Sequence, residues 1–291
     1  MTRAEPASPA VADIVARARD AHRTYERCTQ EQVDLLVAAA GWAIVEPRRN
    51  RELAALAVEA TGIGDVEDKV RKNHRKTLGL LRDLQGARSV GVIREDPAAG
   101  IVEIARPVGV VCAVTPSTNP VATPANKIIN ALKGRNAVVV APSPKGWSVC
   151  ERVIGYIREQ LVRAGMDPTL ARDLVQLLPA PVTKASTAEL MRLADLVVAT
   201  GSQANVRAAY ASGTPAFGVG AGNVAVIVDE TADIESSADR IVRSKTFDNA
   251  TSCSSENSLV LVDAIREPML EALDRRGVVL LDGEQSRRWL G

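Results

Sequence analysis

Apolar residues recur at helical spacing along the first part of the chain. In the segment 32–45 they share one helical face, at Val33, Leu36, Val37, Ala40 and Ile44. The same periodicity predicts helices over residues 10–21, 32–45, 51–61 and 66–84. Pro47 precedes the third helix and Gly62 ends it, which is the usual order of these two residue types. We therefore expect residues 1–85 to form an N-terminal helical part.

The hydrophobic pattern changes near Gly86. Two short β-branched runs, 90–93 and 101–104, flank the turn-rich stretch 96–100, which contains a proline and a glycine. Strand-like runs on either side of such a turn predict a β-hairpin. Residues 86–105 are therefore expected to form a hairpin that bridges the helical part and the rest of the chain.

From Arg106 onward, apolar runs without polar alternation are interleaved with helical segments. The runs are 108–114, 137–140, 174–178, 196–198, 224–228 and 259–262. The helices between them are expected at 122–132, 148–163, 204–211 and 234–246. Strands of this composition are buried on both faces, and the helices make right-handed crossovers between them. The predicted fold class is α/β, with a doubly wound parallel sheet.

Composition narrows the class of protein without naming it. The 291 residues carry 36 Lys and Arg against 35 Asp and Glu, a net charge of +1, which argues against a nucleic-acid or membrane partner. The cluster of basic residues from Lys69 to Lys76 is interpreted as a solvated helix face. No apolar stretch reaches the roughly 18 residues of a membrane span, and the N-terminus lacks an apolar signal core, so a cytoplasmic location is expected.

Cysteine and histidine usage points to free thiols and no metal site. The four cysteines are far apart and show no CxxC spacing, and two histidines are too few for a His-based metal centre. Cys112 has the apolar neighbours of a structural cysteine, whereas Cys253 lies among small polar residues between a predicted helix and a predicted strand. Such a junction can stabilise and expose a thiolate. Two interpretations stay open here: a reactive thiol, or a loop cysteine without a role.

Polar and glycine-bearing loops follow the predicted strands. Asn119 precedes Pro120 directly after a buried strand, and it is interpreted either as a helix N-cap or as an amide donor at the ligand-binding edge of the sheet. Residues 199–202 follow a strand and open a helix, so their amides could hold a pyrophosphate. Residues 218–223 form a second glycine-bearing loop, which precedes a strand and does not match GxGxxG.

Taken together and in this order, four motifs resemble the CoA-acylating aldehyde dehydrogenases. This family of enzymes includes the aldehyde dehydrogenase half of the bifunctional aldehyde–alcohol dehydrogenases. The segment 108–120 resembles the strand and loop with the oxyanion-hole Asn, and Thr200-Gly201-Ser202 resembles the turn under the cofactor. Lys245 to Asn249 followed by Cys253 resembles the nucleophile segment, and Glu67 to His74 resembles an N-terminal helix of that branch. The resemblance implies a dinucleotide-binding domain at 106–229 and the start of a catalytic domain at 230–291.

One departure from the hydrolytic branch bears on the reaction. Hydrolytic members carry a Glu general base in a Glu-Leu-Gly-Gly stretch, and the matching stretch here begins at Gly218. General-base assistance is worth about 10²–10⁴-fold, so water should attack a thioester slowly without it. A thiol acceptor is intrinsically more nucleophilic. The missing carboxylate therefore fits acyl transfer to CoA.

The resemblance also implies a mechanism and a set of binding residues. Cys253 would add to a short aldehyde, and Asn119 would donate to the oxyanion. A nicotinamide, NAD or NADP, would take the hydride, and CoA would take the acyl group. The residues implied to line the dinucleotide are Thr115, Pro116, Pro142, Ser143, Gly201, Ser202, Val219 and Gly220. The lysine that many hydrolytic members use near the adenosine ribose falls at Ala141, which leaves the ribose contact open.

Several expectations concern the chain as a whole. Members of the branch continue well past the nucleophile, so we expect the catalytic domain to be truncated here and the full-length protein to be a homo-oligomer. Acetaldehyde is the default substrate of the branch, and a small charged aldehyde such as sulfoacetaldehyde is the other candidate. Two alternatives remain: a hydrolytic dehydrogenase that uses another base such as Glu256, or a non-catalytic fragment.

Overall fold

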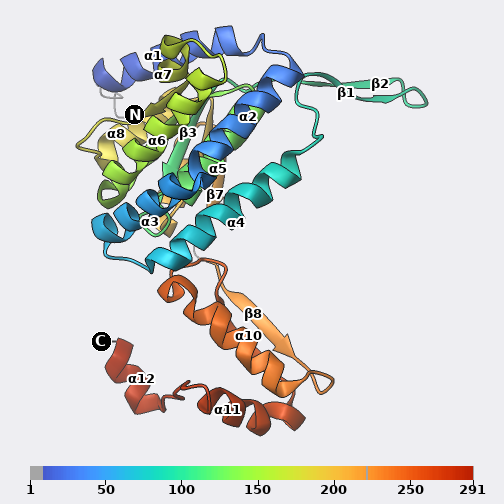
Figure 1. The fold of residues 1–291 in the computed structure, drawn as a ribbon, viewed down its shortest axis with the longest axis vertical. Coiled ribbons are helices and arrows are strands. Elements are labelled where there is room, and N and C mark those ends of the chain that lie inside the picture. The colour runs from blue at the N-terminus through green and yellow to red at the C-terminus, as the bar shows by residue number, and fades with distance from the viewer. Residues whose placement is uncertain (1–8, 221, 291) are drawn as a thin grey trace. The chain divides into compact units, whose positions relative to one another are not determined.

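The computed structural model describes residues 9–220 and 222–290. Two compact units make up the chain, Met1–Ala221 and Gly222–Gly291. The units divide before strand β8, whereas the sequence places its domain boundary at 229/230, after that strand. Figure 1 shows the helices and strands of both units.

The first unit begins with four helices, whose ends follow from local side-chain chemistry. They are α1 (Pro9–Tyr25), α2 (Gln30–Val45), α3 (Pro47–Thr61) and α4 (Val66–Leu84). Thr29 and Gln32 form a reciprocal capping box at the start of α2. Glu46 accepts two backbone N–H groups at the start of α3, Gly62 ends that helix with φ 68°, and Asp65 caps α4. All four predicted helices are present.

A hairpin and a parallel sheet follow. Strands β1 (Gly91–Asp96) and β2 (Ile101–Ala105) pair antiparallel, as the sequence predicts. The sheet contains β3 (Val110–Thr115), β4 (Ala137–Pro142), β5 (Val175–Leu177), β6 (Leu196–Thr200) and β7 (Ala216–Val219). Its order is β5-β4-β3-β6-β7, and every pair is parallel. The chain moves outward from β3 through β4 to β5, then returns to the other side of β3 at β6.

Helices connect the strands and bury the sheet. They are α5 (Ala122–Lys133), α6 (Trp147–Arg163), α7 (Pro168–Leu174), α8 (Lys184–Leu193) and α9 (Gln203–Tyr210), with a 3-10 turn η1 (Pro144–Gly146) before α6. Every residue of β3 and β4 is buried, so both faces of these central strands are covered. The confirmed fold class is therefore α/β with a doubly wound parallel sheet.

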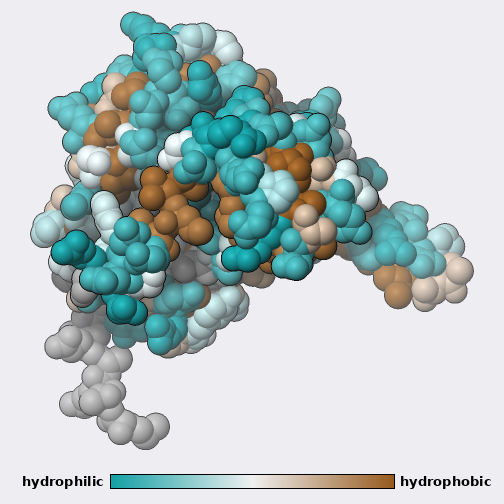
Figure 2. Space-filling model, turned by 90° about the horizontal axis from the view of Figure 1, so that it is seen from below, coloured by the Kyte–Doolittle hydropathy of each residue, from teal (hydrophilic) through white to brown (hydrophobic). Residues whose placement is uncertain are grey.

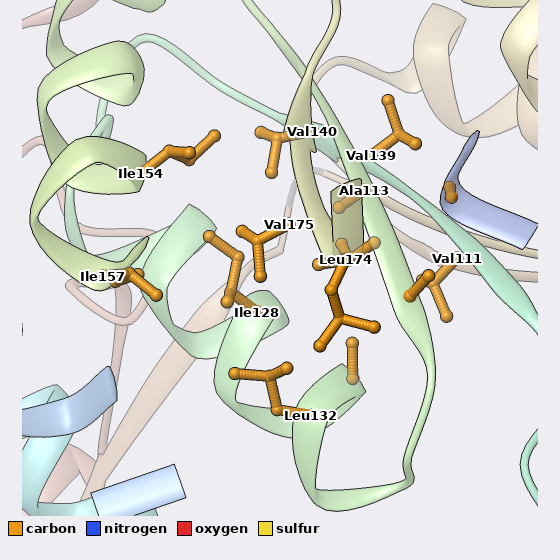
Figure 3. Close-up of a cluster of buried hydrophobic side chains, with 14 of the residues drawn as sticks. Val111, Ala113, Ile128, Leu132, Val139, Val140, Ile154, Ile157, Leu174 and Val175 are labelled. Atoms are coloured by element: carbon orange, nitrogen blue, oxygen red, sulfur yellow. The ribbon is translucent and has the colours of Figure 1, made fainter. Parts of the chain in front are cut away.

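The core lies between the central strands and the crossover helices (Figure 3). Apolar side chains of α5, α6 and α7 meet those of β3, β4 and β5 there. The labelled ones are Val111, Ala113, Ile128, Leu132, Val139, Val140, Ile154, Ile157, Leu174 and Val175. Helix α2 packs against α5 and α6, and α4 packs against α2, α3 and α5. The N-terminal helices are thus part of one core with the sheet, and this packing positions α4 beside α5.

The N-terminal end of β3 depends on a single glycine. Gly109 has φ 120°, and a Cβ atom there would lie 2.3 Å from Asp195 Oδ2. That carboxylate accepts the Val110 N–H at 2.7 Å and pairs with Arg19 at 2.8 Å. The close approach of the carboxylate to the backbone ties β3 to the start of β6.

The second unit is smaller. It contains β8 (Val224–Val228), α10 (Ile234–Thr246), a 3-10 turn η2 (Phe247–Ala250), β9 (Glu256–Leu261), a 3-10 turn η3 (Asp263–Ile265), α11 (Arg266–Asp274) and α12 (Gly283–Leu290). Strands β8 and β9 pair parallel in a sheet of their own, and a small core forms between β8, α10 and α11. The sequence pattern had suggested that residues 224–228 and 259–262 belong to one large sheet, which is wrong.

The other differences from the sequence pattern are short elements. Residues 216–219 form an edge strand, although the sequence analysis assigned Gly218 and Val219 to a loop. Helices α7, α8, α11 and α12 were not predicted, because each spans only two or three turns and carries a weak periodic signal. Thr183 nevertheless supplies a capping box at the start of α8, which was a usable signal.

The face of the molecule drawn in Figure 2 is largely hydrophilic. Figure 2 shows one face of the molecule, where hydrophilic residues predominate and hydrophobic residues gather in separate patches. Three of the most exposed apolar side chains belong to the second unit: Ile227, Val279 and Leu280. Within residues 9–220 and 222–290, no helix is both long and apolar enough to cross a membrane.

Candidate active site

The carboxyl edge of the five-stranded sheet gathers the predicted dinucleotide-binding residues. They lie at the ends of four adjacent strands: Pro142 and Ser143 at β4, Thr115 and Pro116 at β3, Gly201 and Ser202 at β6, and Val219 and Gly220 at β7. The strand order reverses between β3 and β6, and ligands of open α/β sheets bind at such a switch point. Residues that are far apart in the sequence therefore lie along one edge of the sheet.

The β3 and β4 ends are joined by the backbone. The Ser143 N–H donates to the Thr115 carbonyl at 2.9 Å, just past the last paired residues of the two strands. Thr115 is buried, and its hydroxyl lies 4.0 Å from the Cys150 sulfur. Pro116 and Ser143 are half-buried at the surface of the edge. This part of the edge is preformed and offers backbone and hydroxyl groups.

The β6 end forms a tight turn into α9. The Gly201 N–H donates to the Val219 carbonyl at 3.1 Å, which holds the turn against β7. The Ser202 hydroxyl caps α9 by accepting the Asn205 N–H at 3.3 Å. A Cβ atom at position 201 would lie 3.2 Å from Asn205 Nδ2, so the turn leaves little room for a side chain. A helix start with a glycine before it suits the pyrophosphate of a dinucleotide.

Gly218 lies within β7, and side chains of α9 pack closely against it. A Cβ atom there would lie 2.6 Å from Val206 Cγ1 and 2.9 Å from Tyr210 Cε2. The Gly218 N–H also donates to the Tyr210 hydroxyl at 3.1 Å. The position that matches the general base of the hydrolytic branch is thus packed against α9, and a side chain there would have to displace Val206 and Tyr210.

Asn119 does not cap helix α5. The helix starts after Val121, which makes no side-chain capping bond, so the N-cap interpretation is wrong. The Asn119 side chain is half-buried, and its Oδ1 accepts a hydrogen bond from Lys72 Nζ at 2.9 Å. Asn119 follows β3 and so lies at the same sheet edge as the predicted cofactor residues.

Two lysines of α4 are the residues that sequence analysis missed. Lys69 and Lys72 are buried, 3% and 5% exposed, although the run 69–76 was interpreted as a solvated face. Lys69 Nζ donates to the Thr118 carbonyl at 3.3 Å, one residue before the Lys72 contact. The available signal was their spacing of three residues, which puts both lysines on one face of the helix. Few apolar residues share that face, so the spacing alone was a weak signal.

Cys253 lies in the second unit, in a turn between η2 and β9. The predicted helix-to-strand junction is therefore confirmed. Of the four free cysteines, Cys253 is the exposed one. Burial raises the pKa of Cys112 to about 12 and that of Cys150 to about 12, so both are poor nucleophiles. Burial also raises the pKa of the half-buried Cys28.

The backbone before Cys253 is unusual. Asp248, Asn249 and Ala250 all have positive φ, 51°, 52° and 58°. Three consecutive non-glycine residues in the left-handed region are costly, and such strain gathers at functional sites. Asp248 is fully buried, and its carbonyl and carboxylate both accept from the Thr251 hydroxyl, at 2.8 and 2.9 Å. These bonds stabilise the bend that presents the following turn.

Glu256 is the nearest carboxylate to Cys253 along the chain. It is the first residue of β9 and lines a cavity of about 370 Å³ between β8 and α10. Its Oε2 is buried without a hydrogen-bond partner among the described residues. An unpaired buried oxygen of this kind could accept a proton, which keeps Glu256 as the alternative base.

Known proteins resemble this chain over nearly its whole length. The model of the aldehyde dehydrogenase family matches residues 2–281. The sulfoacetaldehyde dehydrogenase (acylating) of Cupriavidus necator is 65% identical over 98% of this chain and 57% of its own length. The crystal structure of an acetylating aldehyde dehydrogenase from Geobacillus thermoglucosidasius superposes with a TM-score of 0.87 at 38% identity, covering 94% of this chain and 60% of the other.

A further solved structure carries ligands. The propionaldehyde dehydrogenase of Rhodopseudomonas palustris, with bound CoA and an acylated cysteine, has a TM-score of 0.82 at 28% identity. It is matched over 96% of this chain and 62% of its own. The chain thus spans about three fifths of the length of each of these three relatives.

Proposed function

Because the chain belongs to the aldehyde dehydrogenase family, in which its relatives are CoA-acylating enzymes, we propose that it oxidises an aldehyde to an acyl-CoA through Cys253. The observation that carries the proposal is the closed Gly218 position beside α9. The hydrolytic branch carries its general base at this position, whereas here the position is a glycine whose Cβ atom would lie 2.6 Å from Val206 Cγ1. Water would therefore cleave an acyl group on Cys253 slowly, and a stronger nucleophile such as the CoA thiol would cleave it faster.

The proposed chemistry assigns a role to each candidate residue. The Cys253 thiolate forms a bond to the carbonyl carbon, and the Asn119 amide donates a hydrogen bond to the oxygen that becomes negative. Such a donor is worth about 3 kcal/mol in the transition state. A nicotinamide held at the carboxyl edge of the sheet would supply the hydride acceptor. The thioester left on Cys253 is then cleaved by the CoA thiol, which gives acyl-CoA and restores the free thiol.

The cofactor residues fit a dinucleotide by the groups that they offer. The edge of β3, β4, β6 and β7 presents three hydroxyls, those of Thr115, Ser143 and Ser202, and the glycine turn at Gly201 that leads into the N-terminus of α9. A pyrophosphate needs N–H donors and close approach to the backbone, which a helix N-terminus preceded by a glycine turn supplies. We assign this edge to NAD or NADP. The full-length protein is proposed to assemble from identical subunits, with the cofactor part at 106–229 and the catalytic part starting at residue 230.

Cys253 acylation is the direct test of the nucleophile. The chain is incubated with an acyl-CoA in the reverse direction, and intact mass spectrometry follows the added acyl group. We expect one acyl group per chain, mapped to Cys253, and none on Cys253→Ser. The matched control is Cys28→Ser, which removes another thiol outside the buried core and should acylate like the wild type. Acylation that persists in Cys253→Ser would contradict the proposal.

Sulfoacetaldehyde is the proposed aldehyde. The support is similarity: 65% and 44% identity to two enzymes named sulfoacetaldehyde dehydrogenase (acylating). Relatives named for other aldehydes, such as the succinate-semialdehyde dehydrogenase (acetylating) of Clostridium kluyveri, are 37% identical. A panel of sulfoacetaldehyde, acetaldehyde and succinate semialdehyde, each with CoA, ranks them by kcat/KM. Sulfoacetaldehyde should rank first, and a higher value for acetaldehyde would refute this assignment.

The alternative function is a hydrolytic dehydrogenase with Glu256 as base. Its specific support is the unpartnered, buried Oε2 of that carboxylate. Under this alternative, Glu256→Gln would lose about 10²–10⁴-fold in the rate of acid release. Under the acylating proposal, acid release is slow in the wild type, and the substitution leaves the CoA-dependent rate within about threefold.

A further inference from the structure

Lys69 and Lys72 lie buried on one face of α4 and hold the loop that follows β3. Burying lysine ammonium groups is unfavourable unless they find hydrogen-bond partners. The two contacts are adjacent: Lys69 Nζ to the Thr118 carbonyl at 3.3 Å, and Lys72 Nζ to Asn119 Oδ1 at 2.9 Å. The first contact holds backbone, whereas the second holds a side chain that the proposed function uses.

The Lys72 contact decides which end of the Asn119 amide faces away from α4. A lysine ammonium has three donors and no acceptor, so it can bond only the amide oxygen. A half-turn of the amide would put its NH₂ group against another donor and lose the bond. The amide nitrogen is therefore directed away from Lys72 and is available to donate elsewhere.

Helix α4 is firmly positioned for this task. Asn50 and Asn73 link it to α3, because Asn50 Nδ2 donates to the Val70 carbonyl at 3.0 Å and Asn73 Nδ2 donates to Asn50 Oδ1 at 3.0 Å. The helix also packs against α2 and α5. Since α5 begins just after the loop that carries Asn119, the donor and the acceptor of the Lys72 bond belong to one packed assembly.

We propose that Lys72 is a positioning residue for catalysis: it holds the Asn119 amide with Nδ2 directed away from α4, which leaves this nitrogen free to donate to the oxyanion. This rests on the proposed function, in which Asn119 is the oxyanion donor. The bond has a second effect. A charged donor on the amide oxygen withdraws electron density from the amide and strengthens its N–H groups as donors. Lys72 thereby acts on the reaction without touching the substrate.

The test compares two substitutions of equal size on the same helix face. Lys72→Met keeps the buried stem and removes the donors, and Lys69→Met is the matched control, which removes the Thr118 contact and leaves the Lys72–Asn119 bond in place. Cys253 acylation at saturating acyl-CoA should slow about 10- to 100-fold in Lys72→Met, the range for a hydrogen bond to a charged group, with KM within about twofold. Lys69→Met should slow it less than about threefold. Equal effects of the two substitutions would overturn the proposal.

A double-mutant cycle separates positioning from a purely structural role. In an Asn119→Ala background, Lys72→Met should cost less than about twofold further, because the amide on which it acts is gone. A full additional loss would overturn the proposal. Lys72→Arg keeps a charged donor and should recover at least about a third of the wild-type rate, which also covers the case that Lys72→Met folds poorly. An Arg variant as slow as Lys72→Met would count against the proposal.

A spectroscopic readout reports the hydrogen bond without catalysis. In ¹⁵N-labelled protein, the side-chain NH₂ resonances of Asn119 are identified by their loss in Asn119→Ala. They should shift in Lys72→Met and stay in place in Lys69→Met. The two possible failures are distinct. A wild type that does not acylate Cys253 refutes the proposed function, and a wild type that acylates while Lys72→Met matches Lys69→Met refutes the positioning role alone.

Discussion

The Gly218→Ala substitution tests whether the general-base position is sterically closed. The new Cβ would lie 2.6 Å from Val206 Cγ1 and 2.9 Å from Tyr210 Cε2, both shorter than real Cβ contacts allow. Tyr210 is 60% exposed and can rotate away, at the loss of its bond to the Gly218 N–H, which is worth about 1 kcal/mol. Val206 is buried on α9 and cannot move without the helix.

The expected loss follows from these two neighbours. Forcing one extra carbon into a packed position typically costs 1–3 kcal/mol, so Gly218→Ala should lower the free energy of unfolding by about 1–3 kcal/mol. Val206→Ala removes the obstructing methyl groups and should cost about 1.6 kcal/mol alone, from two buried carbons at about 0.8 kcal/mol each. In the double variant the obstruction is gone, so the two costs should fall short of additive by at least about 1 kcal/mol.

Urea unfolding followed by circular dichroism measures the four proteins of this cycle. Val37→Ala, a buried valine of α2 remote from Gly218 in sequence, is the control partner and should add its cost to that of Gly218→Ala. A Gly218→Ala variant as stable as the wild type would refute the steric argument. So would strict additivity with Val206→Ala. Gly218→Glu should destabilise still more and should not produce a hydrolytic enzyme.

The remaining predictions concern backbone strain, thiol reactivity and pH. Gly109→Ala should lower the free energy of unfolding by at least about 2 kcal/mol, because φ is 120° and the Cβ would lie 2.3 Å from Asp195 Oδ2. Thermal unfolding measures this loss, and an unchanged melting temperature would contradict the prediction. Iodoacetamide at pH 8 should modify the exposed Cys253 and leave Cys112 unreacted, since a pKa of about 12 leaves only about 10⁻⁴ of the Cys112 thiol as thiolate. Peptide mapping identifies the modified cysteine, and early labelling of Cys112 would refute the burial argument. Burial lowers the pKa of Lys127 from 10.5 to about 8, so between these values the unfolded chain binds more protons and stability should rise with pH by roughly 3 kcal/mol. Lys127→Met should remove that rise in urea titrations, and an identical pH profile in both proteins would show that the ammonium is not desolvated.

The sheet and its edge could be predicted from the sequence because their signals are local. Buried strands such as β3 are continuous apolar runs, and the residues that follow them lie at one edge whenever the strands are parallel. The edge strand β7 was harder to predict from the sequence. Residues 216–219 have three apolar side chains and a glycine, and edge-strand pairing with β6 decides their structure.

The role of the α4 lysines could not be predicted, because it depends on tertiary contact. A run such as 69–76 is usually a solvated face, and charge alone does not reveal which lysines turn inward. Lys69 and Lys72 are buried because α4 packs beside the loop of Asn119, whose oxygens they reach. The same packing explains why Asn119 is not a helix cap: its side chain is engaged by α4 instead. The sequence predicted Asn119 as an oxyanion donor or a helix cap, and it predicted a solvated face for the lysines; the bond between the two was not predictable.

The most direct test of the central claim is the fate of the acyl group on Cys253. The protein is mixed with sulfoacetaldehyde and NAD or NADP, with and without CoA, while reduced cofactor is measured and products are identified by mass spectrometry. We predict that steady-state cofactor reduction requires CoA and that the product is the CoA thioester, with at most one equivalent of reduced cofactor formed per Cys253 in its absence. Cofactor reduction at the same steady rate without CoA, with the free acid as product, would contradict the account.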